Sequence, residues 1–266
     1  MPTSPPTADT AASGPILDIA GARATLRLNR PAVHNRIEPD DLDFIRHTIR
    51  QLNDDHRVRV LVITGTGKTF SSGFHLGELG SSAGRGKPDE PNAFEAMTDE
   101  LEGARFVTVA RLNGPVYGGA TDLALACDFR IGVDSARMFM PAARLGLHYY
   151  GHGIRRWVSR LGLGAAKRLF LTGATIDAQE MLRIGYLDEI APADALDGRV
   201  DALVATLGKQ APRVVETMKQ VLNEAARGEY DHQGADALHR ASLRSRDIRE
   251  ALDAFAGKRE PVFTGA

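Results

Sequence analysis

The chain has 266 residues, of which 43% are hydrophobic and 25% are charged, as is typical of an enzyme-sized globular protein with one large core. Its 34 acidic and 33 basic residues nearly cancel, so no broad charge predicts a nucleic-acid or membrane partner. No apolar stretch approaches the length of a membrane span. The single cysteine, Cys127, excludes a disulfide framework, and its apolar neighbours indicate a buried structural thiol.

The first fourteen residues are rich in Pro, Ser, Thr, Ala and Gly. They have neither the basic start nor the apolar core of a signal peptide. We therefore expect residues 1–14 to be a disordered segment and the protein to be cytoplasmic.

The next part of the chain predicts two strands and a helix. Residues 24–28 alternate as in a strand, before Asn29-Arg30-Pro31 breaks the pattern. Apolar residues recur at helical spacing over 42–52, after Pro39 and Asp40 as start signals. Residues 58–64 are rich in β-branched side chains, which predicts a strand buried on both faces.

A second group of elements follows a loop. Residues 80–92 are rich in Gly, Ser and Pro, which predicts a mobile surface loop. Strands are then expected over 106–112 and 129–133, with a glycine turn and a helix over 119–126 between them. Such repeated strand–turn–helix–strand units favour parallel pairing with crossover helices, and hence an α/β fold.

The chain becomes helical beyond about residue 154. An amphipathic pattern over 155–171 is formed by Trp157, Val158, Leu161 and Leu169, and Asp177 is a plausible N-cap of another helix. Further helices are expected over 200–207, 212–226 and 237–256. We therefore expect an α/β core over 15–200 and a helical C-terminal region over 201–266.

The segment 113–128 carries the clearest functional signal. Its glycine pair, Gly118 and Gly119, leads into an apolar run, and Asp122 follows one turn later. Glycine lets the backbone approach a ligand closely. A helix that begins here would direct free N–H groups and the positive end of its dipole outward, which suits an oxyanion. A turn whose glycines serve packing alone is the alternative.

Four segments, in this order, resemble the crotonase superfamily, also called the enoyl-CoA hydratase/isomerase superfamily. They are Leu28-Asn29-Arg30-Pro31 with Asn35 beyond it, Val62 to Phe74, Asn113 to Asp128, and Phe255 to Phe263. The resemblance covers residues 16–263. It implies a crotonase-like spiral of ββα units with a helical C-terminal trimerisation region, and a homotrimer or a hexamer made of two trimers. It also implies an acyl-CoA substrate. Coenzyme A is then part of the substrate, and we expect no separate cofactor and no metal.

The resemblance assigns an oxyanion hole and contacts to the substrate. Matched motif to motif, the N–H groups of Phe74 and Gly119 would stabilise the enolate oxygen formed from the thioester carbonyl. Lys258 and Phe263 match positions that touch the coenzyme A nucleotide, often from a neighbouring subunit. The remaining expected substrate-binding residues are Ser72, His75, Gly118 and Ala142.

The acid/base positions depart from the family pattern. Hydratases of this family use two glutamates, and the matching positions here hold Asp122 and Ala142. Alanine cannot exchange a proton, whereas acid–base catalysis needs a group within hydrogen-bond reach. We therefore expect poor hydration of an enoyl-CoA, with Asp122 as the retained acid/base.

Residues 147–154 hold the groups that could replace the second glutamate. Tyr149 matches a functional tyrosine of the family's methylmalonyl-CoA decarboxylases, and Tyr150 lies where dienoyl-CoA isomerases and aryl dehalogenases carry an aspartate. His148, His75 and His152 are the other candidates, because a histidine side chain can change charge near neutral pH and so carry a proton. The catalytic candidates are thus Asp122, Tyr149, His148 and Tyr150.

Three functions stay open. The first is a hydratase/isomerase-type lyase or isomerase that works through an enolate. The second is a decarboxylase, C–C lyase or hydrolase that uses Tyr149 or a histidine. The third is an acyl-CoA-binding oligomer without catalysis.

Overall fold

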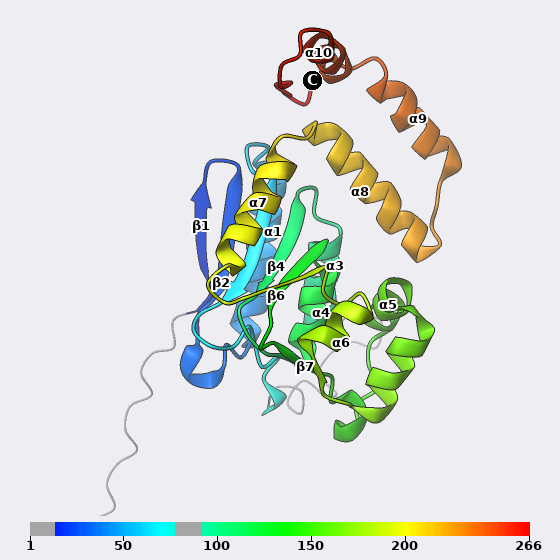
Figure 1. The fold of residues 1–266 in the computed structure, drawn as a ribbon. Helices are drawn as coiled ribbons and strands as arrows, with labels where there is room; N and C mark the ends of the chain where they lie inside the picture. The colour runs from blue at the N-terminus through cyan, green and yellow to red at the C-terminus, as the bar shows by residue number, and fades with distance from the viewer. Residues whose placement is uncertain (1–13, 78–91) are drawn as a thin grey trace, which may run out of the picture.

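The computed structural model describes residues 14–77 and 92–266, and its centre is a six-stranded sheet (Figure 1). The strand order is β1-β2-β3-β4-β6-β9; β1 is antiparallel to β2, and the other neighbours pair in parallel. The strands are β1 (Ile16–Ala20), β2 (Arg23–Leu28), β3 (Val60–Gly65), β4 (Val107–Leu112), β6 (Phe129–Val133) and β9 (Glu189–Ala191).

A smaller sheet and the helices complete the described fold. The small sheet contains β5 (Val116–Tyr117), β7 (Arg137–Phe139) and β8 (Ile176–Asp177). The α-helices are α1 (Pro39–Asp54), α3 (Ala93–Glu102), α4 (Gly119–Ala126), α5 (Gly151–Thr172), α6 (Ala178–Arg183), α7 (Leu196–Gly208), α8 (Pro212–Arg227), α9 (His232–Ser242) and α10 (Arg246–Ala256). Two short 3₁₀ helices are η1 (Pro31–Val33) and η2 (Ala142–Leu145).

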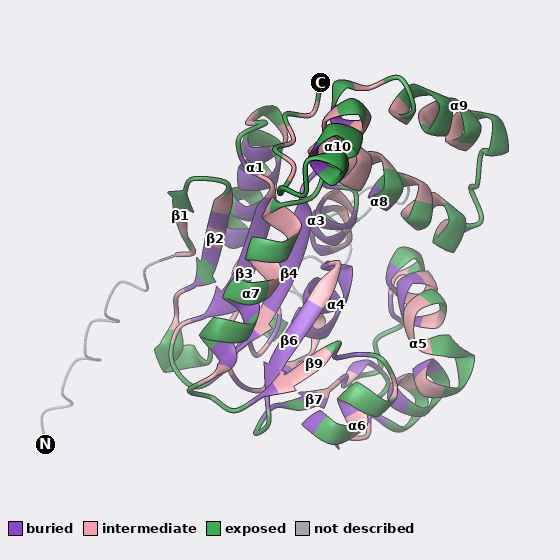
Figure 2. Cartoon of the chain, turned by 45° about the horizontal axis from the view of Figure 1, so that its top comes forward, coloured by how far each residue is buried: buried purple, intermediate pink, exposed green. Residues whose placement is uncertain are grey.

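The core lies on both faces of the large sheet. Helix α7 covers one face, and α1, α3 and α4 lie on the other (Figures 1 and 2). All six residues of β3 are buried, as expected of a central parallel strand covered on both sides. Helix α1 buries Leu42, Ile45, Ile49 and Leu52, which are the residues that its helical spacing predicted.

The predicted mixed α/β class is confirmed. The helix expected over 119–126 and the strand expected over 129–133 have the predicted bounds. Asp177 caps α6 by accepting a hydrogen bond from the Glu180 N–H. Helix α5 buries Trp157 and Leu169, and it extends beyond the predicted 155–171 despite a non-helical Gly162.

Two expectations for the second half of the chain are wrong. The single helix expected over 237–256 is two helices, because Ser245 starts α10 by accepting a hydrogen bond from the Ile248 N–H. The chain beyond residue 154 is also not purely helical, since β9 joins the large sheet beside β6. At three residues, this strand is too short to show an alternating pattern.

Two predictions concern residues that the structure does not describe, which are 1–13 and 78–91. These predictions are the disordered N-terminal segment and most of the mobile loop over 80–92. Within the described ranges, no helix is both long and apolar enough to cross a membrane. Helices α8 and α10 expose Leu222, Leu252 and Phe255, and the expected trimer stays a prediction.

Candidate active site

The loop that follows β3 packs closely against the beginning of α4. The Tyr117 N–H donates to the Ser71 carbonyl oxygen, and the Ile37 N–H donates to the Gly73 carbonyl oxygen. Gly73 has φ +91°, and a Cβ there would lie 2.7 Å from the Tyr117 oxygen and 2.9 Å from the Gly119 nitrogen. Only glycine lets these two backbones approach so closely.

Two backbone donors stay free at this junction. Gly119 is the first residue of α4, so its N–H has no acceptor within the helix. Neither this N–H nor that of Phe74 donates to another residue of the described chain. Gly118, directly before Gly119, has φ 55°, a conformation that favours glycine. The junction therefore has the donors that an oxyanion hole needs, and the assignment of Phe74 and Gly119 to one stays a prediction.

Two asparagines fix the loop that carries Phe74. The Asn35 side chain donates to the carbonyl oxygens of Thr66 and Thr69 at 2.9 and 2.7 Å. The Asn113 side chain accepts from the Gly65 N–H at 3.0 Å and donates to the Thr69 carbonyl oxygen at 3.1 Å. Both motif asparagines thus hold the segment between β3 and the free donors in place, which pre-organises those donors.

Asp122 lies in the first turn of α4 and has no exposed surface. Its Oδ2 accepts hydrogen bonds from the Tyr150 hydroxyl and from Arg156 Nη1, each at 2.5 Å. Its Oδ1 is buried and has no partner in the described chain. Burial raises the pKa of the Asp122 carboxyl, although the Arg156 guanidinium and the Tyr150 hydroxyl oppose the shift. Asp122 is therefore poised to take up a proton more readily than an exposed aspartate.

Arg156 links Asp122 to two carboxylates of α3. Its side chain is fully buried, and its nitrogens contact Glu102 Oε1 at 3.1 Å and Asp99 Oδ1 at 2.8 Å. Burial alone would raise the pKa of Glu102, but the guanidinium groups of Arg156 and Arg160 outweigh it and hold that pKa below its usual value. A buried network of opposite charges thus fixes the base of the site.

Two tyrosines extend from Asp122 toward the next element. The Tyr149 hydroxyl donates to the Tyr150 hydroxyl at 3.1 Å, and the two rings stack with centroids 4.2 Å apart. Burial, followed by the Asp122 charge, raises the pKa of both phenols well above the usual value. Both hydroxyls therefore keep their protons at neutral pH, and the hydrogen-bond chain runs from Tyr149 through Tyr150 to Asp122.

Phe94 connects the tyrosines with the free backbone donors. Its ring centroid lies 6.0 Å from that of Phe74 and 6.4 Å from that of Tyr150. A Cβ at Gly119 would lie 2.9 Å from the edge of the Phe94 ring. Tyr150 and Phe74 therefore flank the same ring, which places the Tyr150–Asp122 pair beside the candidate oxyanion hole.

Ala142 and His148 lie near Tyr149, at a hollow in the surface. Both line a mostly apolar hollow of about 310 Å³ together with Tyr149 and residues of α5. Ala142 is buried, whereas His148 is exposed and its Nδ1 lies 2.8 Å from the Tyr149 carbonyl oxygen. The structure does not bring His148 to Asp122, so within the described residues this histidine is not part of the proton chain.

Ser72 and His75 flank the Phe74 backbone. The Ser72 N–H donates to the His34 carbonyl oxygen at 2.8 Å, and the Ser72 hydroxyl donates to the Val33 carbonyl oxygen at 3.3 Å. His75 Nδ1 lies 2.9 Å from Glu38 Oε2. Their side-chain contacts point to the chain segment before α1, and their assignment to substrate binding stays a prediction.

Lys258 and Phe263 lie at the other end of the large sheet. The Phe263 carbonyl oxygen accepts from Arg59, which precedes β3, whereas the Phe74 loop follows that strand. Lys258 is exposed in the turn after α10, and α10 lies beyond α8, apart from α4 and α5 (Figure 1). One chain therefore does not bring these two residues to its own site, and contact with coenzyme A from a neighbouring subunit stays a prediction.

The predicted burial of Cys127 is confirmed. The residue is fully buried, and burial raises the pKa of its thiol to about 12. Arg156 and Phe94, by contrast, are site residues that the sequence analysis missed. Arg156 directly precedes Trp157 in an amphipathic helix, and a charge there looks like part of a solvated face.

Comparison with known proteins identifies the class. The family model for enoyl-CoA hydratase/isomerase matches residues 19–266. An enoyl-CoA isomerase/hydratase of Mycosarcoma maydis is 30% identical over 90% of this chain and 92% of its own length. A crotonyl-CoA hydratase of Syntrophomonas wolfei is 29% identical over 93% of this chain and 96% of its own.

Solved structures agree. An enoyl-CoA hydratase from Bacillus anthracis superposes with a TM-score of 0.84 and 26% identity, covering 96% of this chain and 100% of the other. The chain is therefore an enzyme of the crotonase fold class, and it belongs to the enoyl-CoA hydratase/isomerase family. The predicted family and fold are confirmed.

Proposed function

We propose that the protein isomerises an enoyl-CoA thioester through an enolate, with Asp122 as its one proton-accepting carboxylate. The observation that carries this proposal is the short hydrogen bond from the Tyr150 hydroxyl to Asp122 Oδ2, beside the two free backbone donors of Phe74 and Gly119. Moving a double bond needs one group that accepts a proton and returns it. Hydration by a carboxylate pair needs a second group, and Ala142 supplies none.

The proposed isomerisation takes one proton from the substrate and returns one to it. A 3-enoyl thioester loses a C2 proton to the Tyr150 oxygen while Tyr150 passes its own proton to Asp122. The negative charge moves to the thioester oxygen, where the N–H groups of Phe74 and Gly119 stabilise it. One such donor contributes on the order of 3–4 kcal/mol. The reverse transfer delivers a proton to C4, and the product is the 2-enoyl thioester.

The burial of Asp122 supports this role. A carboxylate with no exposed surface has a raised pKa, and an acid/base works best when its pKa approaches the working pH. Arg156 keeps the charged form accessible through its ion pair. Tyr150, which is only partly buried, is the member of the pair that can touch substrate.

The experiment follows the rise in conjugated-enoyl absorbance when the protein is given a 3-enoyl-CoA. Asp122→Asn and Tyr150→Phe should each lower the rate about 10²–10⁴-fold. Asp134→Asn, an exposed aspartate after β6, serves as the matched control and should leave the rate unchanged. Unchanged turnover in Asp122→Asn would remove the acid/base role. Hydration of crotonyl-CoA faster than the isomerisation would contradict the expectation that a chain with Ala142 at this position hydrates poorly.

Tyr149 supports a second candidate, a decarboxylase that acts on a malonyl-type thioester. Loss of carbon dioxide leaves an enolate at the same backbone donors, and this enolate then needs only a proton. Tyr149 ends the hydrogen-bond chain and lines the apolar hollow with Ala142, so it can deliver that proton to the enolate and regain one from solvent water. Release of carbon dioxide from malonyl-CoA or methylmalonyl-CoA, lost in Tyr149→Phe, would favour this function. No release from either substrate would remove it.

A protein that binds acyl-CoA without turnover is distinguished by binding. Acetoacetyl-CoA resembles the enolate and should bind in calorimetry if the backbone donors form an oxyanion hole. Binding without turnover of any thioester in a panel would favour the non-catalytic alternative. We also infer a homotrimer, or a hexamer of two trimers, because exposed apolar residues on α8 and α10 suit burial in an interface. Sedimentation as a monomer would contradict that assembly.

A further inference from the structure

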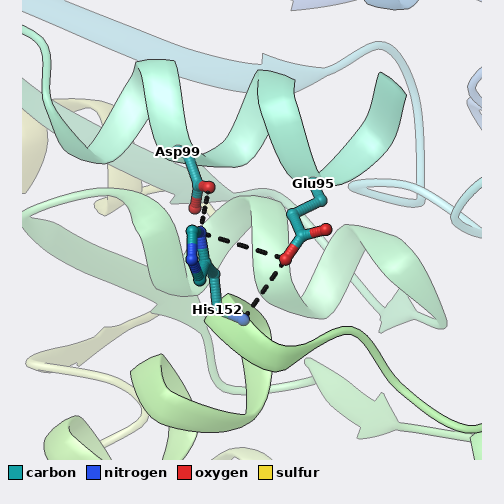
Figure 3. A group of neighbouring side chains, drawn as sticks. All are labelled: Glu95, Asp99 and His152. Atoms are coloured by element: carbon teal, nitrogen blue, oxygen red, sulfur yellow. Dashed lines mark hydrogen bonds and ion pairs between the residues drawn. The ribbon is translucent and has the colours of Figure 1, made fainter. Parts of the chain in front are cut away.

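A histidine and two carboxylates converge at the outer end of the Arg156 ion-pair network. Glu95 and Asp99 lie one turn apart on α3, and His152 lies in the first turn of α5 (Figure 3). One ligand atom of each lies within 4.8 Å of the others. Figure 3 shows both carboxylates directed at the imidazole ring. Helical spacing explains the pair on α3, since residues four apart share one face.

We propose that Glu95, Asp99 and His152 bind a divalent transition-metal ion of the zinc type. Zinc takes imidazole nitrogen and carboxylate oxygen, and a site with three protein ligands keeps a fourth position for water. The ligand atoms would be His152 Nδ1, Asp99 Oδ2 and Glu95 Oε1. The nitrogen lies 2.5 Å from the Asp99 oxygen and 3.9 Å from the Glu95 oxygen.

These distances suit a metal ion after a small adjustment. Tetrahedral zinc with ligand bonds of about 2.0–2.2 Å separates its ligand atoms by about 3.3 Å. The Asp99–His152 pair must therefore open by less than an ångström, and the Glu95–His152 pair must close by a similar amount. His152 is partly exposed, with 55% of its side-chain surface accessible, which gives its ring room to shift and gives the ion a path from solvent.

A buried neighbour already holds one ligand in place. Asp99 offers Oδ2 to His152 and Oδ1 to Arg156 Nη2, at 2.8 Å. It can therefore bind a metal through one oxygen and keep its contact with Arg156 through the other. Ligating carboxylates are normally oriented by such hydrogen bonds from a second layer of residues. The backbone N–H of His152 also donates to Glu95 Oε1 at 3.3 Å, which fixes the second carboxylate near the imidazole ring.

The charges of the network favour a cation at this position. Among the described residues, three carboxylates pair with three guanidinium groups: Asp99, Glu102 and Asp122 with Arg155, Arg156 and Arg160. Glu95 lies beside this network and pairs with His152. No arginine or lysine of residues 14–77 and 92–266 contacts the Glu95 carboxylate. Within the described residues the Glu95 carboxylate therefore has no cationic partner other than His152, and a divalent ion would offset its charge.

The test is zinc binding by the full-length chain after treatment with a chelator, measured by calorimetry with ZnCl₂. We expect one ion per chain, and binding at least about tenfold weaker in His152→Ala and in Glu95→Gln. The matched control is His47→Ala, because His47 is an exposed histidine on α1, and this variant should bind as tightly as the wild type. In a second readout, Co²⁺ should give visible absorption bands that Glu95→Gln weakens.

Two outcomes would overturn the proposal. One is the lack of saturable zinc binding at 100-fold molar excess over the chain. The other is equal zinc affinity in the wild type and in Glu95→Gln. In the wild type, the Glu95 carboxylate contacts His152 alone among the described residues. Since this variant leaves Arg156 and its partners intact, loss of folding does not explain a negative result. Neither readout depends on turnover, so the proposed function stands or falls separately.

Discussion

Replacement of Arg156 by methionine should destabilise the protein severely. The Arg156 side chain is fully buried and pairs with Asp99, Glu102 and Asp122. Methionine fills much of the same volume but leaves three carboxylates without that counter-charge. Removal of one partner from a buried ion pair costs about 3–5 kcal/mol of unfolding free energy. We expect a loss in this range at pH 7, which is a large share of the total stability of a typical domain.

The loss should depend on pH in a defined direction. The pKa of Glu102 is held below its usual 4.5 in the native protein, so its stabilising contribution is present above pH 4.5 and is lost as the pH falls through the lowered value. The raised pKa of Asp122 acts in the opposite sense, because its protonated form favours the native state at low pH. As the pH falls through the lowered pKa of Glu102, both acids become protonated and need less counter-charge, so the difference between Arg156→Met and the wild type should shrink.

The assay is urea unfolding of both proteins at equal concentration, with the m-value compared as well as the midpoint. Arg57→Met is the matched control, because Arg57 is exposed and, among residues 14–77 and 92–266, pairs only with the nearby Asp55. It should leave the midpoint unchanged. Arg156→Lys keeps the charge without the planar fork and should lie between Arg156→Met and the wild type. A loss below about 1 kcal/mol in Arg156→Met would refute the assignment of this network to stability.

Three further predictions follow from the site. Gly73→Ala should weaken acetoacetyl-CoA binding at least tenfold, because the added Cβ would meet the Tyr117 oxygen and the Gly119 nitrogen. Gly21→Ala is the control: Gly21 also has a positive φ, but no atom lies within 4 Å of its added Cβ. This variant should cost only about 1 kcal/mol of stability and should bind acetoacetyl-CoA as the wild type does. The Cys127 thiol, with its pKa of about 12, should resist alkylation at pH 8 until urea unfolds the chain, and fast labelling of native protein would be contrary. The acid limb of kcat/KM should lie above pH 3.8, because burial raises the pKa of Asp122; a limb at or below 3.8 would exclude Asp122 as the titrating group.

Local patterns in the sequence predicted the elements that carry the candidate oxyanion hole. The glycine pair and the apolar run after it predicted α4, and β-branched residues predicted β3. These signals are local, since they depend on backbone freedom at glycine and on side-chain spacing within one element. Strand β9 and the break between α9 and α10 were missed, because three residues and a single capping serine carry too little local signal.

The sequence by itself determined the family and the fold class, and its resemblance to the family predicted the two backbone donors at Phe74 and Gly119. The same resemblance predicted that Asp122 lacks a carboxylate partner, because Ala142 stands at the position of the second glutamate. Only the tertiary structure decided what surrounds Asp122: Arg156 and Tyr150 come from α5 and its N-cap, about 30 residues away. The physical reason is that burial, ion pairing and hydrogen bonding depend on packing between helices. No spacing along one helix encodes them.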